Sequence, residues 1–383
     1  MRPAPPQAAR GSALPRIALT SLLLICVTSH GALAQPTPDR VARIRAIDPN
    51  VLPTDDESRK QHERVLHEYA RARIDEANRK STLAWRAIES REQWETFIAQ
   101  KRAALQRAVG AFPEGAGVRS TRVTRTFEGV GYTIRNVVYE SRPGFYVTAN
   151  LYSPDPLPKN DKSAPGILIV HSHHNPKTQS ELQDMGVMWA RVGCHVLVPD
   201  QLGHGERRQH PFVTSSDYDG DFRVSRQDYY FRYNVGMQLS LAGDSLVGWM
   251  AWDNMRGFDV LLQQPGIDDD RLIILGAVAG GGDPCAVTAA LDERIDAAVP
   301  FNFGGPQPET RFPLPEDAEM AFNYAGGGSW ESTRNIPLAA ARGALPWVIV
   351  GAVAPRPLVY AHEFAWDREN DPVWKRYERV WGE

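Results

Sequence analysis

Residues 271–284 read RLIILGAVAGGGDP, and the interpretation of the whole chain starts from this stretch. It begins with a run of branched apolar residues, which is typical of a strand buried on both faces of a sheet. The run continues into a cluster of small residues and then into Asp283-Pro284, a pair that favours a helix start. A buried strand that turns sharply into a helix indicates an α/β protein.

Apolar strands and helical segments alternate on both sides of this stretch. Strands are predicted at 166–170, 195–199, 295–300 and 357–361, and helices at 182–192, 239–262 and 286–291. Three earlier segments, 121–127, 132–139 and 145–152, alternate β-branched or aromatic residues with polar ones and predict antiparallel strands. The predicted fold class is therefore α/β, with a mostly parallel sheet and helices on both faces.

Changes in composition predict three regions. Residues 1–34 combine three arginines, a short apolar run and Ala32-Leu33-Ala34, so we expect a signal peptide and a secreted or periplasmic mature protein. Residues 35–115 predict an N-terminal helical extension, with helix from Asp55 to about Val109. Residues 116–383 form the expected main domain, with insertions at 205–236 and 304–345 that are rich in Gly, Pro, Arg and aromatic residues.

The composition excludes several classes of protein. The chain is 42% hydrophobic, which is typical of a folded globular protein. After residue 34 it has 40 basic and 46 acidic residues and no concentrated basic face, so no nucleic-acid partner is expected. After signal cleavage no membrane association is expected either. Cys194 and Cys285 lie in separate predicted elements, and we expect two free thiols in apolar surroundings.

From Thr121 onward the chain resembles the α/β-hydrolase superfamily, and within it secreted bacterial acetylxylan-esterase-like and dienelactone-hydrolase-like proteins. The stretch at 271–284 is similar to the nucleophile elbow, a sharp turn with small residues around the reactive side chain. Three other motifs carry the resemblance: IVHSHH at 169–174 for the oxyanion loop, PDQLGHGERR at 199–208 for the turn after the fourth strand, and APRPLVY at 354–360 for the strand before the catalytic acid.

The resemblance implies a set of catalytic positions. The family's elbow reads small-x-Ser-x-Gly, and its register on Gly280–Gly282 places Ala279 at the nucleophile position, which is therefore vacant. Oxyanion N–H groups are implied at Gly280, His171, Ser172 and His173. The catalytic acid is implied at Asp367 or Glu363, of which Asp367 fits the spacing better.

The family's triad histidine lies beyond the last strand, and this chain has none after Asp367. We therefore expect a hydrolase fold that lacks its final strand and histidine loop. The expected function is that of a carboxylic-ester hydrolase scaffold for acyl or uronate esters of carbohydrates, inactive or weakly active as written. The alternative is a secreted, non-catalytic carbohydrate-binding protein on the same scaffold. No cofactor is expected.

Other residues near these motifs permit different chemistry. Asp283 could replace the missing nucleophile, although Asp-Pro at a helix start is typical of an N-cap. Cys285 within the helix is expected to be a buried small hydrophobe. His171 and His173 alternate along the chain and could share a metal ion with His204 and Asp200. Their place in the oxyanion loop favours a backbone role, so no metal is predicted.

The two insertions, and Trp347 just after the second, carry the residues expected to contact substrate. Aromatic side chains suit the apolar faces of sugar rings, and arginines bind carboxylates or hydroxyls. The candidates are Arg207, Arg208, Trp330 and Trp347. The pattern favours a carbohydrate ester or another small acyl ester as partner. The alternative is that most of the aromatic residues pack the insertions against the core.

Overall fold

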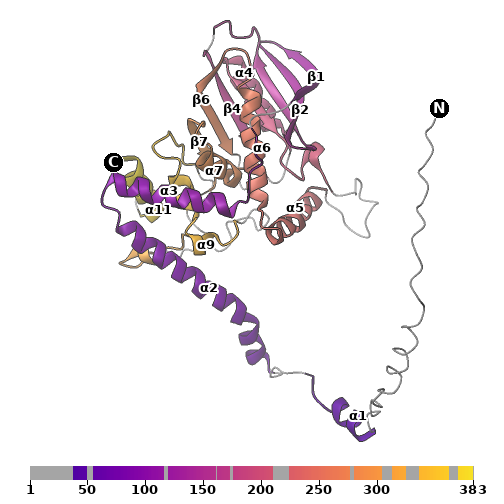
Figure 1. Cartoon of the computed structure of the whole chain (residues 1–383), viewed down its shortest axis with the longest axis vertical. Helices are drawn as coiled ribbons and strands as arrows, with labels where there is room; N and C mark the ends of the chain where they lie inside the picture. Colours follow the sequence, from indigo (N-terminus) through magenta and orange to yellow (C-terminus); the bar gives the residue numbers. More distant parts are fainter. Residues whose placement is uncertain are drawn as a thin grey trace, which may run out of the picture. The chain divides into compact units, whose positions relative to one another are not determined.

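The computed structural model describes residues 38–49, 55–115, 120–160, 162–172, 176–209, 224–276, 280–303, 313–324, 336–361 and 370–382. The predicted signal peptide lies outside these ranges. The chain forms two compact units, Met1–Glu68 and Tyr69–Glu383. Helix α1 (Pro38–Arg45) belongs to the first unit, and α2 (Asp56–Arg86) begins in it. The described strands and the remaining described helices belong to the second unit (Figure 1).

The described strands form one mixed sheet, with the order β1-β2-β3-β5-β4-β6-β7. They are β1 (Thr121–Gly129), β2 (Tyr132–Arg142), β3 (Phe145–Pro154), β4 (Ala164–Val170), β5 (His195–Pro199), β6 (Ile267–Gly276) and β7 (Ala297–Pro300). The first three pair antiparallel, and so do β3 and β5, whereas β5, β4, β6 and β7 run parallel. This confirms the predicted α/β class and the antiparallel segments that precede the parallel strands.

Side chains of the parallel strands alternate between two hydrophobic cores. Leu168 and Val170 of β4 pack on one face, in a cluster that includes Phe258 of α6 (Leu246–Leu261) and residues of α7 (Gly282–Leu291). Ile167 and Ile169 pack on the other face against α4 (Ser180–Arg191). Burial on both faces explains why the sequence of β4 is apolar without alternation.

The predicted last strand, 357–361, is reduced to a single bridge. Leu358 pairs in parallel with Ala298 of β7. The Ala298 N–H donates to the Pro357 carbonyl (3.1 Å), and the Val359 N–H donates to the Ala298 carbonyl (3.0 Å). The segment therefore follows β7 as an edge strand would, although only one residue pair has full strand geometry.

Two predicted helices are each divided in two. Instead of one helix over 239–262, α5 (Val224–Leu241) ends before α6 begins, because Gly243 adopts a φ of +84° between them. The predicted helix from Asp55 to Val109 consists of α2 and α3 (Arg91–Ala108). The Ser90 side chain caps α3 by accepting a hydrogen bond from the Gln93 N–H (3.2 Å).

Short helices complete the second unit: η1 (Gly205–Arg207), α8 (Ala318–Ala321), α9 (Ala339–Arg342), α10 (Pro346–Gly351) and α11 (Pro372–Gly382). A third hydrophobic cluster joins α3 and the end of α2 to α7, α10 and α11. Both cysteines after residue 34 are buried free thiols, as predicted. No helix in the described ranges is both long enough and apolar enough to cross a membrane.

Candidate active site

The carboxyl ends of three parallel strands meet at one edge of the sheet. Val170, the last residue of β4, pairs with Gly276 at the end of β6, and Gly276 pairs with Pro300 at the end of β7. The segments that follow these residues therefore leave the sheet side by side. Open α/β sheets bind their ligands at this edge, so we place the candidate site here.

The turn from β6 into α7 requires glycine on both sides of its tip. A Cβ atom on Gly276 would lie 2.5 Å from the Cβ of Cys285, and one on Gly282 would collide with the Phe301 carbonyl oxygen. Gly280 has a φ of +91°, which residues with a side chain rarely adopt. The described parts of the turn therefore have the tight geometry that the sequence predicts. Ala279 itself lies outside the described residues.

Helix α7 begins earlier than predicted. Its N-cap is Gly281 and its first residue is Gly282, so Asp283 lies inside the first turn and is not the N-cap. The prediction was wrong because it assigned the cap from the Asp-Pro pair, whereas the glycines before it permit the helix to start two residues sooner. Asp283 is 8% exposed. Its negative charge near the helix N-terminus is favourable for the helix dipole.

Cys285 is fully buried in the same helix, as the sequence predicted. Its Sγ faces the Ile274 carbonyl oxygen at 3.7 Å, on the strand that α7 covers. Burial raises the pKa of the Cys285 thiol far above its usual value. The thiolate needed for nucleophilic attack is therefore disfavoured.

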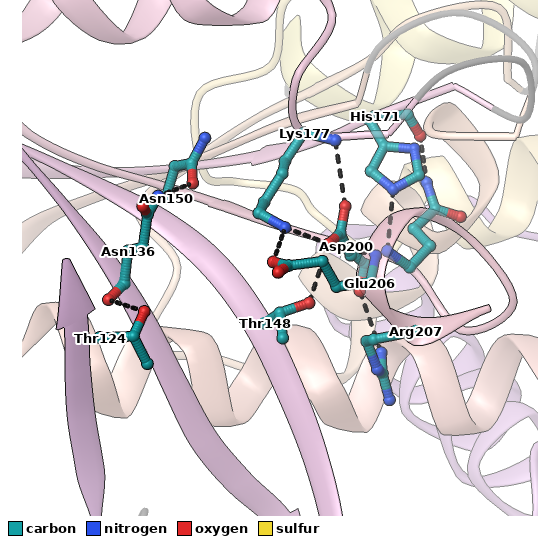
Figure 2. A network of polar contacts seen from close by, with 10 residues as sticks. Thr124, Asn136, Thr148, Asn150, His171, Lys177, Asp200, Glu206 and Arg207 are labelled. Atoms are coloured by element: carbon teal, nitrogen blue, oxygen red, sulfur yellow. Dashed lines mark hydrogen bonds and ion pairs between the residues drawn. The ribbon is translucent and has the colours of Figure 1, made fainter.

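His171, the first residue after β4, is fully buried, and its hydrogen bonds determine its tautomer (Figure 2). Nε2 accepts a hydrogen bond from the Gln201 N–H at 2.8 Å and therefore carries no proton. Nδ1 lies 2.6 Å from the Ser172 carbonyl oxygen and therefore donates. Gln201 Nε2 also donates to the His171 carbonyl. With both ring nitrogens engaged, His171 holds the start of this loop in place and is not positioned as a metal ligand or a general base.

Asp200, directly after β5, is the centre of a buried polar network (Figure 2). Its carboxylate accepts hydrogen bonds from Thr148 Oγ1 (2.8 Å), the Glu206 N–H (3.2 Å) and the Lys177 N–H (3.2 Å). It also forms a buried ion pair with Lys177 Nζ, which in turn contacts Glu206 at 2.7 Å. The network ties the segment after β4 to the turn after β5. Asp200 and His171 therefore both have structural partners at the carboxyl edge of the sheet.

Arg207 extends this network into the core. Its Nη1 donates to the Asp200 carbonyl (3.0 Å) and lies 2.8 Å from Asp253 Oδ2 of α6. The side chains of Arg207 and Asp253 are 4% and 5% exposed. The Tyr139 hydroxyl donates to the Asp253 carbonyl at 3.0 Å, and burial raises the pKa of Tyr139. The prediction that Arg207 contacts substrate is therefore not supported by its position; Arg208, which is partly exposed, stays a candidate.

Trp347 lies in the core and not at a ligand-binding surface. It is 1% exposed, in α10. Its ring packs edge-on against Trp85 with ring centres 5.2 Å apart, and the Arg376 guanidinium lies 4.5 Å from its ring centre. The sequence could not separate a buried aromatic residue from a substrate-binding one, because both occur in or beside Gly- and Pro-rich segments.

Several predicted site residues lie outside the described ranges. They are Ala279, His173, Glu363, Asp367 and Trp330. Of the predicted oxyanion residues, Gly280, His171 and Ser172 are described, and they follow the neighbouring strands β6 and β4. The register of the sheet thus brings the described part of the predicted oxyanion hole to one edge.

Sequence reasoning missed Lys177 and Asp253. Neither belongs to a recognisable motif: Lys177 follows a proline in a loop, and Asp253 lies in a helix that mixes apolar residues with Asn254, Arg256 and Asp259. The available signal was a charged residue in a segment rich in apolar residues, because a buried charge requires a partner. The identity of that partner, Arg207, depends on the packing of α6 against the turn after β5.

Carboxylates also gather at the opposite end of β6. The carboxylates of Asp268, Asp269 and Asp270 lie close enough to one another to share a metal ion. Lys162 Nζ pairs with Asp269 at 2.5 Å and with Asp270 at 3.2 Å. The group is mostly exposed and far along the strand from the candidate site, and we assign it no role.

Comparisons with known proteins show similarity at the level of structure. No family model and no curated protein sequence matches the chain. A solved methylesterase matches 80% of this chain and 60% of its own, with 19% identity and a TM-score of 0.56. A candidate acetyl xylan esterase from Bacteroides fragilis matches 77% of this chain and 74% of its own, with 18% identity and a TM-score of 0.51. A glucuronoyl esterase from Solibacter usitatus gives a TM-score of 0.45 at 15% identity, over 77% of this chain and 82% of its own.

Proposed function

From the α/β-hydrolase fold of this chain, we propose a carboxylic-ester hydrolase scaffold for acyl or uronate esters of carbohydrates. We propose further that Ala279 at the nucleophile position leaves this chain inactive or weakly active as an esterase. The observation that carries the proposal is the glycine-dependent turn between β6 and α7, beside the segment that follows β4. Such a turn presents a nucleophile at the edge of the sheet where substrates bind.

The chemistry would proceed by acyl transfer in a chain with serine at position 279. The serine oxygen attacks the ester carbonyl, and the negative charge of the tetrahedral intermediate is held by backbone N–H groups at Gly280 and in the loop after β4. The alcohol then leaves with a proton, and water hydrolyses the acyl-enzyme. With alanine at 279 the attacking oxygen is missing, so at most a residual enhancement of roughly 10³ to 10⁴ over water is expected.

A general base is also required, and His362 is a candidate that the sequence analysis overlooked. The Ala361 carbonyl accepts a hydrogen bond from the Asn302 N–H at 3.0 Å, just beyond the end of β7. Residue 361 therefore lies at the carboxyl edge of the sheet. His362 is the next residue of the chain, directly before Glu363, and lies outside the described residues. The acid is proposed to be Asp367 or Glu363, as expected from the sequence.

The choice of carbohydrate esters rests on the structural neighbours and on the predicted export of the chain. The two neighbours with TM-scores above 0.5 are a methylesterase and a candidate acetyl xylan esterase. A predicted signal peptide is compatible with a polymer substrate outside the cell. Acetyl esters and methyl esters of uronic acids are both candidate substrates.

The proposal is tested by restoring the nucleophile. We expect Ala279→Ser to hydrolyse 4-nitrophenyl acetate and acetylated xylan about 10²-fold or more faster than the unmodified chain, since a positioned base adds at least this factor. Ala279→Gly is the matched control: it changes the same position without adding a hydroxyl, and its rate should equal that of the unmodified chain. Adding His362→Gln to Ala279→Ser should remove most of the gain.

The alternative function is a secreted carbohydrate-binding protein without catalysis, favoured by the alanine at position 279. Equal rates for the serine and glycine variants would reject the esterase scaffold and support this alternative. A gain in the serine variant that His362→Gln leaves intact would retain the esterase but reject His362 as its base.

A further inference from the structure

The second unit contains a pocket of about 390 Å³ that the proposed function does not use. It lies between the end of α2, helix α3, helix α11 and the turn at Ala354–Arg356. Three tryptophans line it, Trp85, Trp94 and Trp381, together with four arginines and two glutamates. Its volume is within the range of pockets that hold small molecules or one portion of an oligomer.

This pocket lies at the opposite end of the strands from the candidate active site. Glu293, which lines it, precedes β7, and Ala354–Arg356 precedes the 357–361 segment that runs parallel to β7. Both therefore lie at the amino ends of their strands. Gly280 and His171 follow the carboxyl ends of β6 and β4. A ligand in this pocket would not compete with an ester at the catalytic edge.

The aromatic lining provides flat apolar faces. Trp94 is partly exposed and rests on Trp85, which is 5% exposed and meets it edge-on, with ring centres 6.0 Å apart and an interplanar angle of 87°. The Trp381 Nε1–H donates to the Arg356 carbonyl at 2.9 Å, which fixes the orientation of that ring. Indole rings held at different angles by their neighbours can contact successive faces of a ring-shaped ligand without losing much side-chain entropy.

The charges of the lining favour an anion. Arg91 pairs with Glu95 at 2.9 Å, and Arg102 pairs with Glu293 at 3.1 Å. Arg356 instead donates to backbone carbonyls, at Ala289 (2.6 Å), Asp292 (3.0 Å) and Ile295 (2.7 Å). Carbonyl oxygens satisfy its hydrogen bonds but do not cancel its charge. The lining as a whole has four arginines against two glutamates, which favours an anion.

Arg102 has a donor left over. Its Nη2 donates to the Ala352 carbonyl at 2.8 Å and its Nη1 contacts Glu293, whereas its buried Nε has no acceptor among the described residues. A buried donor without an acceptor costs free energy. The Nε itself is enclosed by protein atoms, and the exposed part of the Arg102 side chain lines the same pocket as the tryptophans.

We propose that this pocket is a second binding site for an acidic oligosaccharide, one that carries a uronic acid carboxylate on a chain of neutral sugars. Tryptophan faces stack on the apolar faces of the sugar rings, and the arginine-rich lining pairs with the carboxylate. The site would hold polymer at the amino edge of the sheet. The choice of a glycan rests on the proposed function; the choice of an anion rests on the charges of the pocket alone.

The test is a calorimetric titration of the full chain with xylotriose that carries one glucuronic acid branch, and with neutral xylotetraose, which has the same number of sugar units. We expect the acidic oligosaccharide to bind about tenfold more tightly than the neutral one. Binding should weaken at higher salt, because a partly exposed ion pair is screened. Equal affinities for the two oligosaccharides, or no heat for either at millimolar concentration, would overturn the proposal.

Variants locate the site. Arg91→Ala should weaken binding of the acidic oligosaccharide about threefold, as expected for an exposed charge pair. Arg107→Ala is its matched control, since Arg107 is an exposed arginine on the same helix outside the pocket, and it should change nothing. Glu95→Gln removes a repelling carboxylate and should strengthen binding of the acidic oligosaccharide only. Trp94→Ala should weaken both ligands about tenfold.

This experiment separates the pocket from the catalytic proposal. Binding is measured on the chain with Ala279 in place, so it does not depend on hydrolysis. Failure of Ala279→Ser to hydrolyse esters leaves the binding result unaffected. Conversely, hydrolysis of 4-nitrophenyl acetate by the Ala279→Ser chain does not require the pocket, because this small ester carries neither a sugar nor a carboxylate. An effect of Arg107→Ala as large as that of Arg91→Ala would show nonspecific charge attraction and reject the pocket.

Discussion

Buried histidines show how the hydrogen bonds of one residue determine what it can do. His171 and His195 are both fully buried, in or next to neighbouring strands. His195 Nε2 donates to the Pro265 carbonyl at 2.9 Å, and its Nδ1 lies 3.0 Å from Ser153 Oγ. Arg135 donates to the same Ser153 oxygen at 2.9 Å, so the serine hydroxyl proton points to Nδ1. Each imidazole is therefore held neutral in one tautomer.

The neutral state of His195 predicts sensitivity to acid. Burial, together with the charge of Arg135, lowers the pKa of His195 below 6.5. The unfolded chain takes up this proton near pH 6.5 whereas the folded chain does not, so stability is lost as pH falls below that value. We expect the midpoint of urea unfolding to be lower at pH 5 than at pH 7.5 in the unmodified chain. The decrease should be smaller in His195→Gln, because glutamine can make both hydrogen bonds without titrating. An equal fall in both chains would contradict this assignment.

Lys177 is the residue whose removal should cost most stability in the network around Asp200. Lys177→Met leaves a buried carboxylate without its cation, and we expect a loss of about 3–5 kcal/mol in the free energy of unfolding. Thr148→Val removes one hydrogen bond from the same carboxylate and should cost about 1 kcal/mol. Urea denaturation measures both. A Lys177→Met chain as stable as Thr148→Val would show that the ion pair has little net value.

At the scale of elements, the turn between β6 and α7 depends on contacts that the glycines permit. Helix α7 approaches the segment after β7 so closely that Gly282 has no room for a side chain. The same closeness lets Gly281 cap the helix and directs its N-terminus towards the candidate site. The geometry of the turn is therefore a property of packing between α7 and the sheet as well as of the local sequence.

This packing predicts that one methyl group disrupts the turn. Gly282→Ala should destabilise the protein by about 1–3 kcal/mol or more, because the new Cβ collides with the Phe301 carbonyl oxygen. Gly382→Ala is the matched control, since nothing lies within 4 Å of a Cβ there, and alanine in a helix is favourable by up to about 1 kcal/mol. In thermal unfolding, only Gly282→Ala should have a lower midpoint than the unmodified chain. A rise in the midpoint of both variants would contradict the close approach of Gly282 to the Phe301 carbonyl.

At the scale of the whole molecule, the part of the predicted helical extension from residue 69 onward packs into the second unit. Trp85, Ile98 and Leu105, from α2 and α3, are buried in one cluster with residues of α7, α10 and α11. Arg376 of α11 joins them: its guanidinium lies 3.7 Å from the ring centre of Tyr324 and forms an ion pair of 2.9 Å with Glu319. The helices from residue 69 onward therefore complete the core of the second unit.

Two deletions test this division. Removal of residues 1–68 should leave the unfolding midpoint of the remainder unchanged, since the second unit begins at Tyr69. Removal of residues 1–115 should abolish cooperative unfolding, because each buried Trp, Ile or Leu contributes roughly 1.5–3 kcal/mol against a total stability of roughly 5–15 kcal/mol. Circular dichroism and dye binding measure the outcome. Cooperative unfolding of a chain that starts at residue 116 would refute the shared core.

Much of the fold could be predicted because apolar strands carry their own signal. The segments at 166–170 and 195–199 became β4 and β5 with shifts of two residues or fewer, and the described glycines at 276 and 280–282 have the geometry of a tight turn. The break at Gly243 was missed because apolar residues continue on both sides of it. The cap of α7 was misplaced because a glycine N-cap has no side-chain signature.

The sequence by itself determined the α/β class, the strand-to-helix turn and the alanine at position 279. The reason is that branched apolar residues indicate strands buried on both faces, and glycines indicate a backbone that can turn sharply. Only the tertiary structure decided the tautomer of His171, the pairing of Lys177 with Asp200, the burial of Arg207 and Trp347, and the pocket at the amino edge. The physical reason is that a charge or an aromatic ring has no fixed role of its own. Its function depends on which distant partners the packed chain brings within a few ångströms.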